Sequence, residues 1–130
     1  ERGWRGALQD AGVEAPPVVR GDWSAESGYV AAASLGTATA IFCANDQMAL
    51  GLTRALADQG RRVPEDVSVV GFDDVPDAAN YRPPLTTIRQ NFSALAEAAV
   101  SALIADIEET GSESAIVIST ELIDRSSTRP

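Results

Sequence analysis

The segment IFCANDQMALGLTRAL, residues 41–56, decides the fold of this 130-residue chain. It begins within an apolar run, residues 40–44, that is short enough for one buried strand. Polar Asn45 and Asp46 follow at the point where a helix is expected to begin, and apolar side chains then recur at helical spacing until Gly60. The pattern predicts a strand feeding a helix, half of a βαβ unit. Ligands of open α/β sheets bind beyond the carboxyl ends of the strands, so the polar pair marks a candidate site.

Outward from this segment, short apolar runs alternate with amphipathic stretches. A first helix is expected through Trp4, Leu8 and Ala11. No N-cap precedes it, which predicts that the beginning of the fold is missing. Further helices are expected at 25–35 and 92–109, strands at 15–20, 40–44, 67–72, 85–88 and 115–123, a one-turn excursion at 75–82, a polar loop at 111–114 and a frayed tail from 125 to 130. This alternation predicts an α/β class with a mainly parallel sheet.

Composition restricts the class of protein. The length suits one domain, and 45% hydrophobic with 22% charged residues is ordinary for a soluble globular chain. No apolar run approaches the roughly 18 residues of a membrane span, and the first residues do not resemble a signal peptide. The single cysteine, Cys43, falls in an apolar strand and is expected to be a core thiol. One cysteine forms no internal disulfide, which fits a reducing, cytoplasmic compartment.

Charge and the absence of histidine exclude several functions. The net charge is −9 and every basic residue is an arginine, so this surface repels a phosphate backbone and direct binding to nucleic acid is not expected. Without histidine the chain lacks the commonest general base and metal ligand. No phosphate-binding loop motif is present, and no side chain supplies Cys43 with a base. We therefore expect no catalytic residue, no cofactor and no metal.

Polar and aromatic side chains gather at the predicted strand ends. The four ends carry Asp22 and Trp23, Asn45 and Asp46, Asp73 and Asp74, and Gln90. In a parallel sheet these ends lie along one edge. Amides and carboxylates can hydrogen-bond neighbouring hydroxyls while an aromatic ring covers the apolar face of a sugar. The pattern therefore predicts a site for a polyhydroxylated ligand; a carboxylate cation site is the competing interpretation, which the aromatic ring and the amides suit poorly.

Each of these residues also has a purely structural interpretation. Asn45 or Asp46 could serve only as a helix cap. Asp73 and Asp74 could be turn residues, and Trp23 could pack into the core rather than contact a ligand. From spacing alone these alternatives stay open.

Four motifs resemble a known family. They are GDWSAESGY (21–29), AIFCANDQMALG (40–51), RRVPEDVSVVGFDD (61–74) and PPLTTIRQNF (83–92). In this order and spacing they resemble the effector-binding core of the lactose/galactose-repressor (LacI/GalR) family of bacterial transcription regulators. The resemblance covers nearly the whole chain, and the GDWS and NDQMALG segments are most similar to repressors that respond to galactosides.

The resemblance implies a fold and a set of site residues. The family's core has two similar lobes of the periplasmic-binding-protein-like type I fold, with the effector between them, and this chain would be the C-terminal lobe, incomplete at its N-terminus. Helix 92–110 would belong to the missing lobe, so we expect it to be swapped onto a second copy or packed non-natively. Motif positions imply effector contacts at Trp23, Asn45, Asp73, Gln90 and Phe92, and a dimer interface at Leu50 and Tyr81. The family has no catalytic residues.

The expected function is sensing of a sugar effector, with a galactoside as the first candidate, in a cytoplasmic, ligand-controlled transcription repressor. Operator DNA would be contacted only through a missing N-terminal headpiece, and the protein would be a homodimer or higher oligomer without a membrane partner. Two alternatives remain: a sugar-binding protein of a transport system, which shares the fold, and an enzyme built on a Rossmann-like sheet.

Overall fold

A four-stranded sheet organises the protein. The computed structural model describes residues 1–108 and 115–129. Strands β1 (Ala40–Phe42), β2 (Ser68–Asp73) and β3 (Thr86–Arg89) run parallel in that order, and β4 (Glu121–Ile123) pairs antiparallel with β3. The predicted α/β class with a mainly parallel sheet is therefore confirmed.

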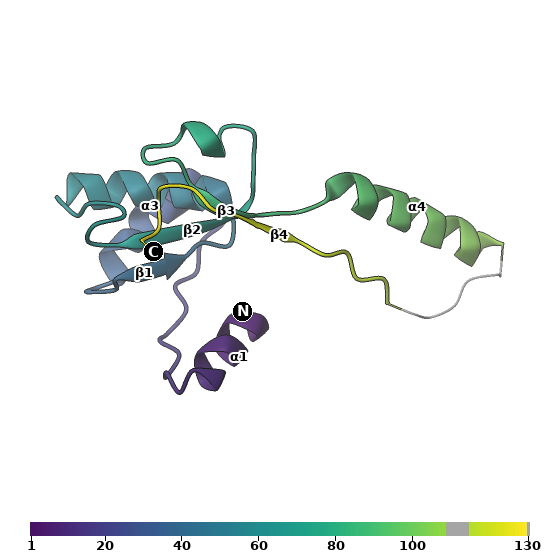
Figure 1. Cartoon of the computed structure of the whole chain (residues 1–130), viewed down its shortest axis with the longest axis horizontal. Coiled ribbons are helices and arrows are strands. Elements are labelled where there is room, and N and C mark those ends of the chain that lie inside the picture. Colours follow the sequence, from purple (N-terminus) through teal and green to yellow (C-terminus); the bar gives the residue numbers. More distant parts are fainter. Residues whose placement is uncertain (109–114, 130) are drawn as a thin grey trace.

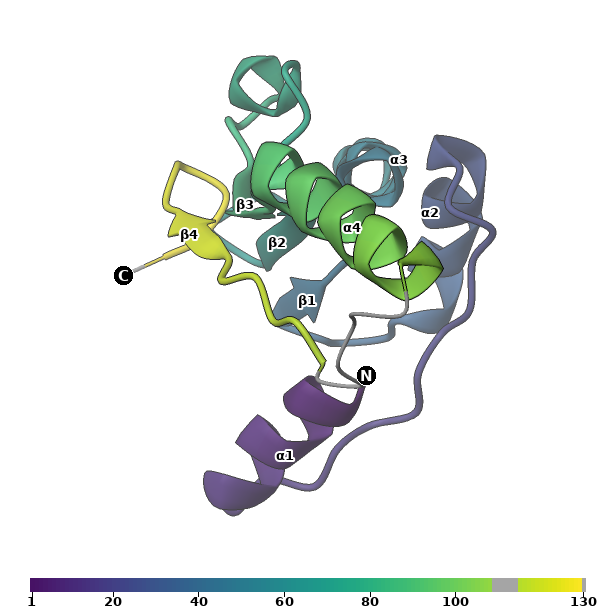
Figure 2. The same ribbon diagram turned by 90° about the vertical axis from the view of Figure 1, so that its right-hand side faces the viewer.

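Two helices cover one face of this sheet (Figures 1 and 2). They are α2 (Ala25–Ala31), which continues into the short 3-10 helix η1 (Ala32–Ser34), and α3 (Asp46–Asp58). Glycines let their backbones touch: a methyl group added to Gly28 would overlap the backbone of Met48, and one added to Gly51 would overlap the carbonyl of Ala25. The close contact fixes how the two helices, and the loops before them, sit on the sheet.

The core lies between the sheet and these helices. Leu52 and Leu56 of α3 are buried against Val67, Val69 and Leu85. On the other face of the sheet, by contrast, the ring of Phe42 stays half exposed and meets Phe72 edge to face at 6.4 Å between centroids. The 3-10 helix η2 (Ala78–Asn80) forms the predicted excursion after β2.

Helices α1 (Arg2–Asp10) and α4 (Phe92–Ile107) project from this body (Figure 1). Neither contains a buried residue, and the apolar side chains of α4 face solvent. Assignment of α4 to a second lobe stays a prediction. The last predicted residues of this helix, 109 and 110, and the loop at 111–114 lie outside the described residues.

Three predictions about local structure were wrong. Residues 15–20 form no strand, because none of the four described strands pairs with them and Pro16 and Pro17 offer no N–H group to a ladder. Of the β-rich segment at 115–123, only β4 pairs. The described part of the tail, 125–129, is not frayed. Ser127 is buried and hydrogen-bonds Val69 in both directions: the N–H of Val69 donates to the Ser127 carbonyl (2.8 Å), and the Ser127 hydroxyl donates to the Val69 carbonyl (2.6 Å).

Candidate functional site

Asn45, which follows β1, caps α3. Its Oδ1 accepts from the N–H of Met48 at 2.9 Å, and its Nδ2 donates to the backbone oxygen of Trp23 at 2.9 Å and to Oε1 of Gln47 at 3.2 Å. The residue is 7% exposed. Capping is thus one role of this side chain, and its amide also holds the loop that carries Trp23.

Trp23 is held at the surface by a strained loop. Its φ angle is +74°, in the left-handed region that non-glycine residues rarely adopt, and the residue is 65% exposed. Asp22 braces the turn, because its Oδ1 accepts from both the hydroxyl (2.5 Å) and the N–H (3.0 Å) of Ser24. These two hydrogen bonds also lower the pKa of Asp22. The ring is therefore available for contact, and packing into the core is not its role.

Asp46 is a structural residue that joins three elements. It is fully buried; its Oδ1 accepts from the hydroxyl of Thr87 at 2.6 Å, and its Oδ2 accepts from the N–H of Val75 at 2.9 Å. Gly71 leaves the necessary room, since a Cβ there would overlap Asp46 Oδ1. The sequence placed an acid at the start of a helix, but only burial shows that it connects α3, β3 and the loop after β2.

Two adjacent acids at the end of β2 have different contacts. Asp73, at φ +112°, accepts a hydrogen bond on Oδ1 from Nε2 of Gln90 at 2.7 Å. Asp74, at φ +55°, forms ion pairs with Arg89 and Arg125, each at 2.6 Å. Burial by itself raises the pKa of Asp74, but hydrogen bonds from Arg125 and then Arg89 outweigh it, so the pKa lies below its usual value. Both acids are more than turn residues.

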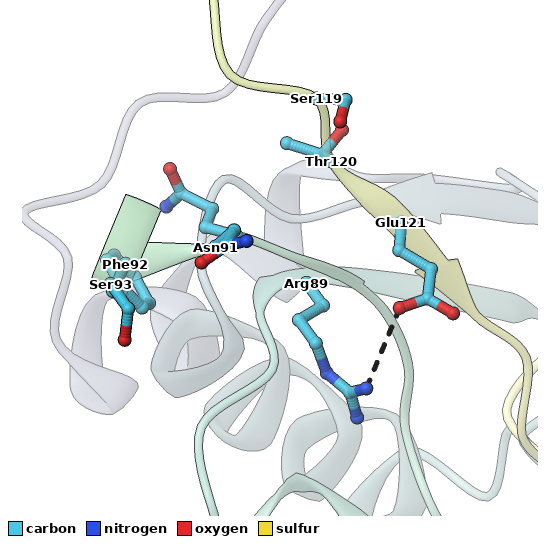
Figure 3. A pocket seen from close by; sticks show the side chains of 8 residues that line it. Arg89, Asn91, Phe92, Ser93, Ser119, Thr120 and Glu121 are labelled. Atoms are coloured by element: carbon cyan, nitrogen blue, oxygen red, sulfur yellow. Dashed lines mark ion pairs between the residues drawn. The ribbon is translucent and has the colours of Figure 1, made fainter. Parts of the chain in front are cut away.

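A hollow of about 490 Å³ opens where the chain leaves β3 and returns to β4 (Figure 3). Gln90 and half-exposed Phe92 contribute to its wall. Arg89 and Glu121, which face each other across the two strands, approach to 3.7 Å. The complete lining is Arg89, Gln90, Asn91, Phe92, Ser93, Ser119, Thr120 and Glu121.

Four of the predicted site residues form two hydrogen-bonded pairs at one end of the sheet. Asn45 contacts Trp23 beyond β1, and Gln90 contacts Asp73 beyond the neighbouring strands β2 and β3. Phe92 follows directly at the start of α4. Of these five residues, only Gln90 and Phe92 line the hollow.

The two predicted interface residues belong to α3 and to the segment after η2. Leu50 sits on an outer position of α3 and is 42% exposed. Tyr81 is partly buried and packs against the core. Their role in a dimer stays a prediction.

The side chains at this edge can form hydrogen bonds and aromatic contacts with a ligand. Within residues 1–108 and 115–129, no group of three or more histidine, cysteine or acidic side chains could hold a metal ion. Burial, with a smaller contribution from the charge of Asp46, raises the pKa of Cys43 to about 12, so the thiol stays protonated at neutral pH and is a poor nucleophile. In the same described part of the chain, no helix is both long and apolar enough to traverse a bilayer.

The mainly parallel sheet, with its polar and aromatic residues at one end, is typical of a ligand-binding α/β lobe, and comparison with known proteins agrees. The family described as periplasmic binding protein-like domain matches residues 1–128, so the chain belongs to that family. Within it, the similarities point to the effector-binding core of LacI/GalR-type regulators, which confirms the resemblance found in the motifs.

Sequence relatives are repressors. The chain is 38% identical over 130 residues to the HTH-type transcriptional repressor PurR of Pasteurella multocida (strain Pm70), covering 95% of this chain and 39% of the relative. It is 42% identical over 106 residues to the lactose operon repressor of Escherichia coli (strain K12), covering 78% of this chain and 29% of the relative. The chain therefore spans well under half the length of these relatives.

Solved structures give the same result. The lac repressor dimer bound to operator and the anti-inducer ONPF superposes with a TM-score of 0.91 at 37% identity, over 98% of this chain and 46% of that one. The complex of the transcriptional regulator CelR with cellobiose gives 0.89 at 35% identity, over 97% and 41%. Both cover the sheet, its helices and the edge described above.

Proposed function

We propose that this chain is the effector-binding part of a ligand-controlled bacterial transcription repressor, and that its effector is a sugar, with a galactoside as the first candidate. The observation that carries the proposal is the pair of strained residues, Trp23 and Asp73, at one end of the sheet, each hydrogen-bonded by an amide side chain. Strain of this kind persists only where the surroundings enforce it, and it clusters at ligand sites.

The geometry suits a polyhydroxylated ring. The carboxylate of Asp73 retains acceptor capacity beside its hydrogen bond from Gln90 and would accept from sugar hydroxyls. Exposed Trp23 would cover the apolar face of the ring, and Phe92 would contact it near the hollow. Asn45 has both amide hydrogens engaged within the protein, which leaves mainly its oxygen for a ligand.

Control of transcription would follow from unequal binding. A sugar shifts an equilibrium between two arrangements of the intact protein only by binding one of them more tightly. We infer that operator DNA is contacted through a separate headpiece of the intact, cytoplasmic protein, and that Leu50 and Tyr81 lie in its dimer interface. The lac repressor among the relatives is a dimer bound to operator.

The relatives favour a regulator over the other two interpretations. Two relatives that match 95% and 78% of this chain, at 38% and 42% identity, are transcriptional repressors. We infer that the chain has no catalytic activity.

A thermal-shift screen of the intact protein tests the proposal. D-galactose, lactose and cellobiose are the probes, and adenine is a control of different chemistry. A sugar that binds stabilises the folded protein by about 2.7 kcal/mol at a concentration 100 times the Kd. The melting temperature rises accordingly. Asp73→Asn, which loses the charge but keeps one acceptor oxygen, should reduce the shift without abolishing binding. Asp58→Asn, at the C-terminal end of α3, should leave the shift unchanged. No shift with any sugar, or a shift with adenine alone, contradicts the proposal.

A reporter experiment tests the regulatory role. With a reporter gene placed under the protein's own operator, Asp73→Ala should abolish induction by the sugar while repression remains. Equal induction in Asp73→Ala and the unmodified protein would refute the role of this carboxylate.

A further inference from the structure

The buried carboxylate of Asp74 ties three segments together. Its side chain is only 6% exposed. Oδ2 accepts from Nε of Arg89 at 2.7 Å and lies 2.6 Å from Nη2 of the same residue; Oδ1 accepts from Nη2 of Arg125 at 2.6 Å. Arg125 is fixed in turn, because its Nη1 donates to the backbone oxygen of Leu85 at 2.7 Å. Paired on both oxygens, Asp74 is held in one position.

The two arginines stand where the chain leaves the sheet and where it comes back. Arg89 is the last residue of β3, just before the segment that leads to α4, and Arg125 follows β4 on the return. The two segments pair at β3 and β4, and Figure 1 shows them diverging beyond the sheet, the one after β3 leading into the projecting α4. Asp74 therefore anchors both connections to the end of the central strand β2.

Asp73 depends on the same anchor. Its φ of +112° is one that L-residues rarely adopt, and Asp74 beside it is left-handed as well. On one side, strand register pairs Asp73 with Arg89; on the other, the ion pairs hold Asp74. The next contact along the chain is the hydrogen bond from the N–H of Val75 to Asp46 Oδ2, so the ion pairs of Asp74 hold the stretch between that contact and β2. With those ion pairs broken, we expect residue 73 to relax to a commoner conformation and turn its carboxylate away from Gln90.

We propose that Asp74 is a positioning residue: with Arg89 and Arg125 it holds Asp73 in its ligand-facing conformation and, through the same contacts, sets the direction of the two segments that lead to α4. Because Asp73 and Asp74 are adjacent, a ligand that binds Asp73 would also affect the segments held by Asp74, and through them the orientation of α4. The coupling rests on the ligand-binding function proposed above, whereas the anchoring of the two segments does not.

Hydrogen exchange of the intact protein without ligand tests the anchor. In Asp74→Asn, peptides covering 86–89 and 119–125 should exchange at least about fivefold faster than in the unmodified protein, because their shared ion pairs are lost. Arg125→Gln, which removes one of the two pairs, gives a milder version if Asp74→Asn folds poorly. Asp58→Asn, which loses an exposed pair with Arg54, is the matched control and should leave these peptides unchanged. Unchanged exchange in both Asp74→Asn and Arg125→Gln overturns the anchor.

A double-mutant cycle tests whether Asp74 acts through Asp73. The probe is lactose, or whichever of D-galactose and cellobiose stabilises the unmodified protein more. Asp74→Asn should weaken its binding by about tenfold, and the same change in an Asp73→Asn background should have no further effect on the Kd. Independent, additive losses would show a merely structural role and overturn the positioning. If the unmodified protein binds none of the three sugars, the proposed function and the coupling fail, while hydrogen exchange still decides the anchor.

Discussion

The carboxylate of Asp46 and the hydroxyl of Thr87 lie 2.6 Å apart, and this contact joins the first turn of α3 to the third strand of the sheet. The same carboxylate accepts the N–H of Val75 from the loop after β2. The buried carboxyl group of Asp46, which follows β1, thus contacts β3 and the loop after β2, and so connects the three strands that carry the candidate site.

Removing this carboxylate should destabilise the protein strongly. Asp46→Ala leaves the hydroxyl of Thr87 and the N–H of Val75 without an acceptor, and we expect a loss of about 3 kcal/mol in the free energy of unfolding. Asp46→Asn keeps the shape and one acceptor, so a smaller loss, about 1 to 2 kcal/mol, is expected. Urea denaturation measures both. A loss under about 0.5 kcal/mol for Asp46→Ala would show that the contact matters little.

Substitutions of Asn45 should separate capping from its link to Trp23. Asn45→Asp keeps a capping oxygen for the N–H of Met48 but loses the amide that donates to the Trp23 carbonyl. The new carboxylate oxygen would face the Trp23 carbonyl, so we expect a loss of about 1 kcal/mol in stability, with altered Trp23 fluorescence in a Trp4→Phe background. Asn45→Ala loses the cap as well and should cost about 1 kcal/mol. Unaltered fluorescence in Asn45→Asp contradicts the link.

Comparison of glycine and alanine at position 23 should reveal the strain of the loop. Glycine adopts a φ of +74° without the steric cost that alanine meets. Trp23→Gly should therefore be more stable than Trp23→Ala by up to about 1 kcal/mol, measured by urea denaturation. Both variants lack the ring and should lose the thermal shift caused by the sugar. Greater stability of the alanine variant would show that the loop has relaxed from this conformation.

The contact between α2 and α3 should not tolerate a methyl group. Gly51→Ala would place its Cβ on the carbonyl of Ala25, so the helices must separate, and we expect a loss of at least about 2 kcal/mol. Gly6→Ala in α1 is the matched control: apart from the adjoining residues and the nearby backbone of α1, no atom lies within 4 Å of the added methyl group, and better helix propensity should make it neutral or stabilising by about 0.5 to 1 kcal/mol. Thermal unfolding ranks the two variants, and the reverse order would contradict the packing.

Alkaline pH should weaken the fold through Cys43. The pKa of its thiol is raised to about 12 in the folded protein, against about 8.5 for an exposed thiol. Above about pH 8.5 the unfolded chain therefore releases a proton that the folded protein keeps, and stability falls by up to about 1.4 kcal/mol per pH unit as pH rises toward 12. Cys43→Ala removes this component, so its stability should fall less between pH 8 and 10. Parallel pH profiles of the two proteins would rule out the effect.

Much of this fold was predictable because the signals were local. The run at 40–44 predicted β1, the polar pair Asn45 and Asp46 predicted where α3 begins, and helical spacing up to Gly60 predicted its extent; the cap and the periodicity involve residues only three or four apart. The failed predictions depended on distant partners. Residues 15–20 are apolar enough for a strand, but β-structure needs a neighbouring strand with which to pair.

By itself the sequence determined the α/β alternation, the polar and aromatic residues at the strand ends and the membership of a family whose motifs it carries in order. Tertiary structure alone decided the contacts of the acids: Asp46 is buried and accepts two hydrogen bonds, Asp74 is ion-paired with two arginines, and Asp73 accepts a hydrogen bond from Gln90. The physical reason is distance along the chain. Asp46 meets Thr87 across 41 residues, Asp74 meets Arg125 across 51, and Ser127 meets Val69 across 58, and no local pattern reports a partner so far away.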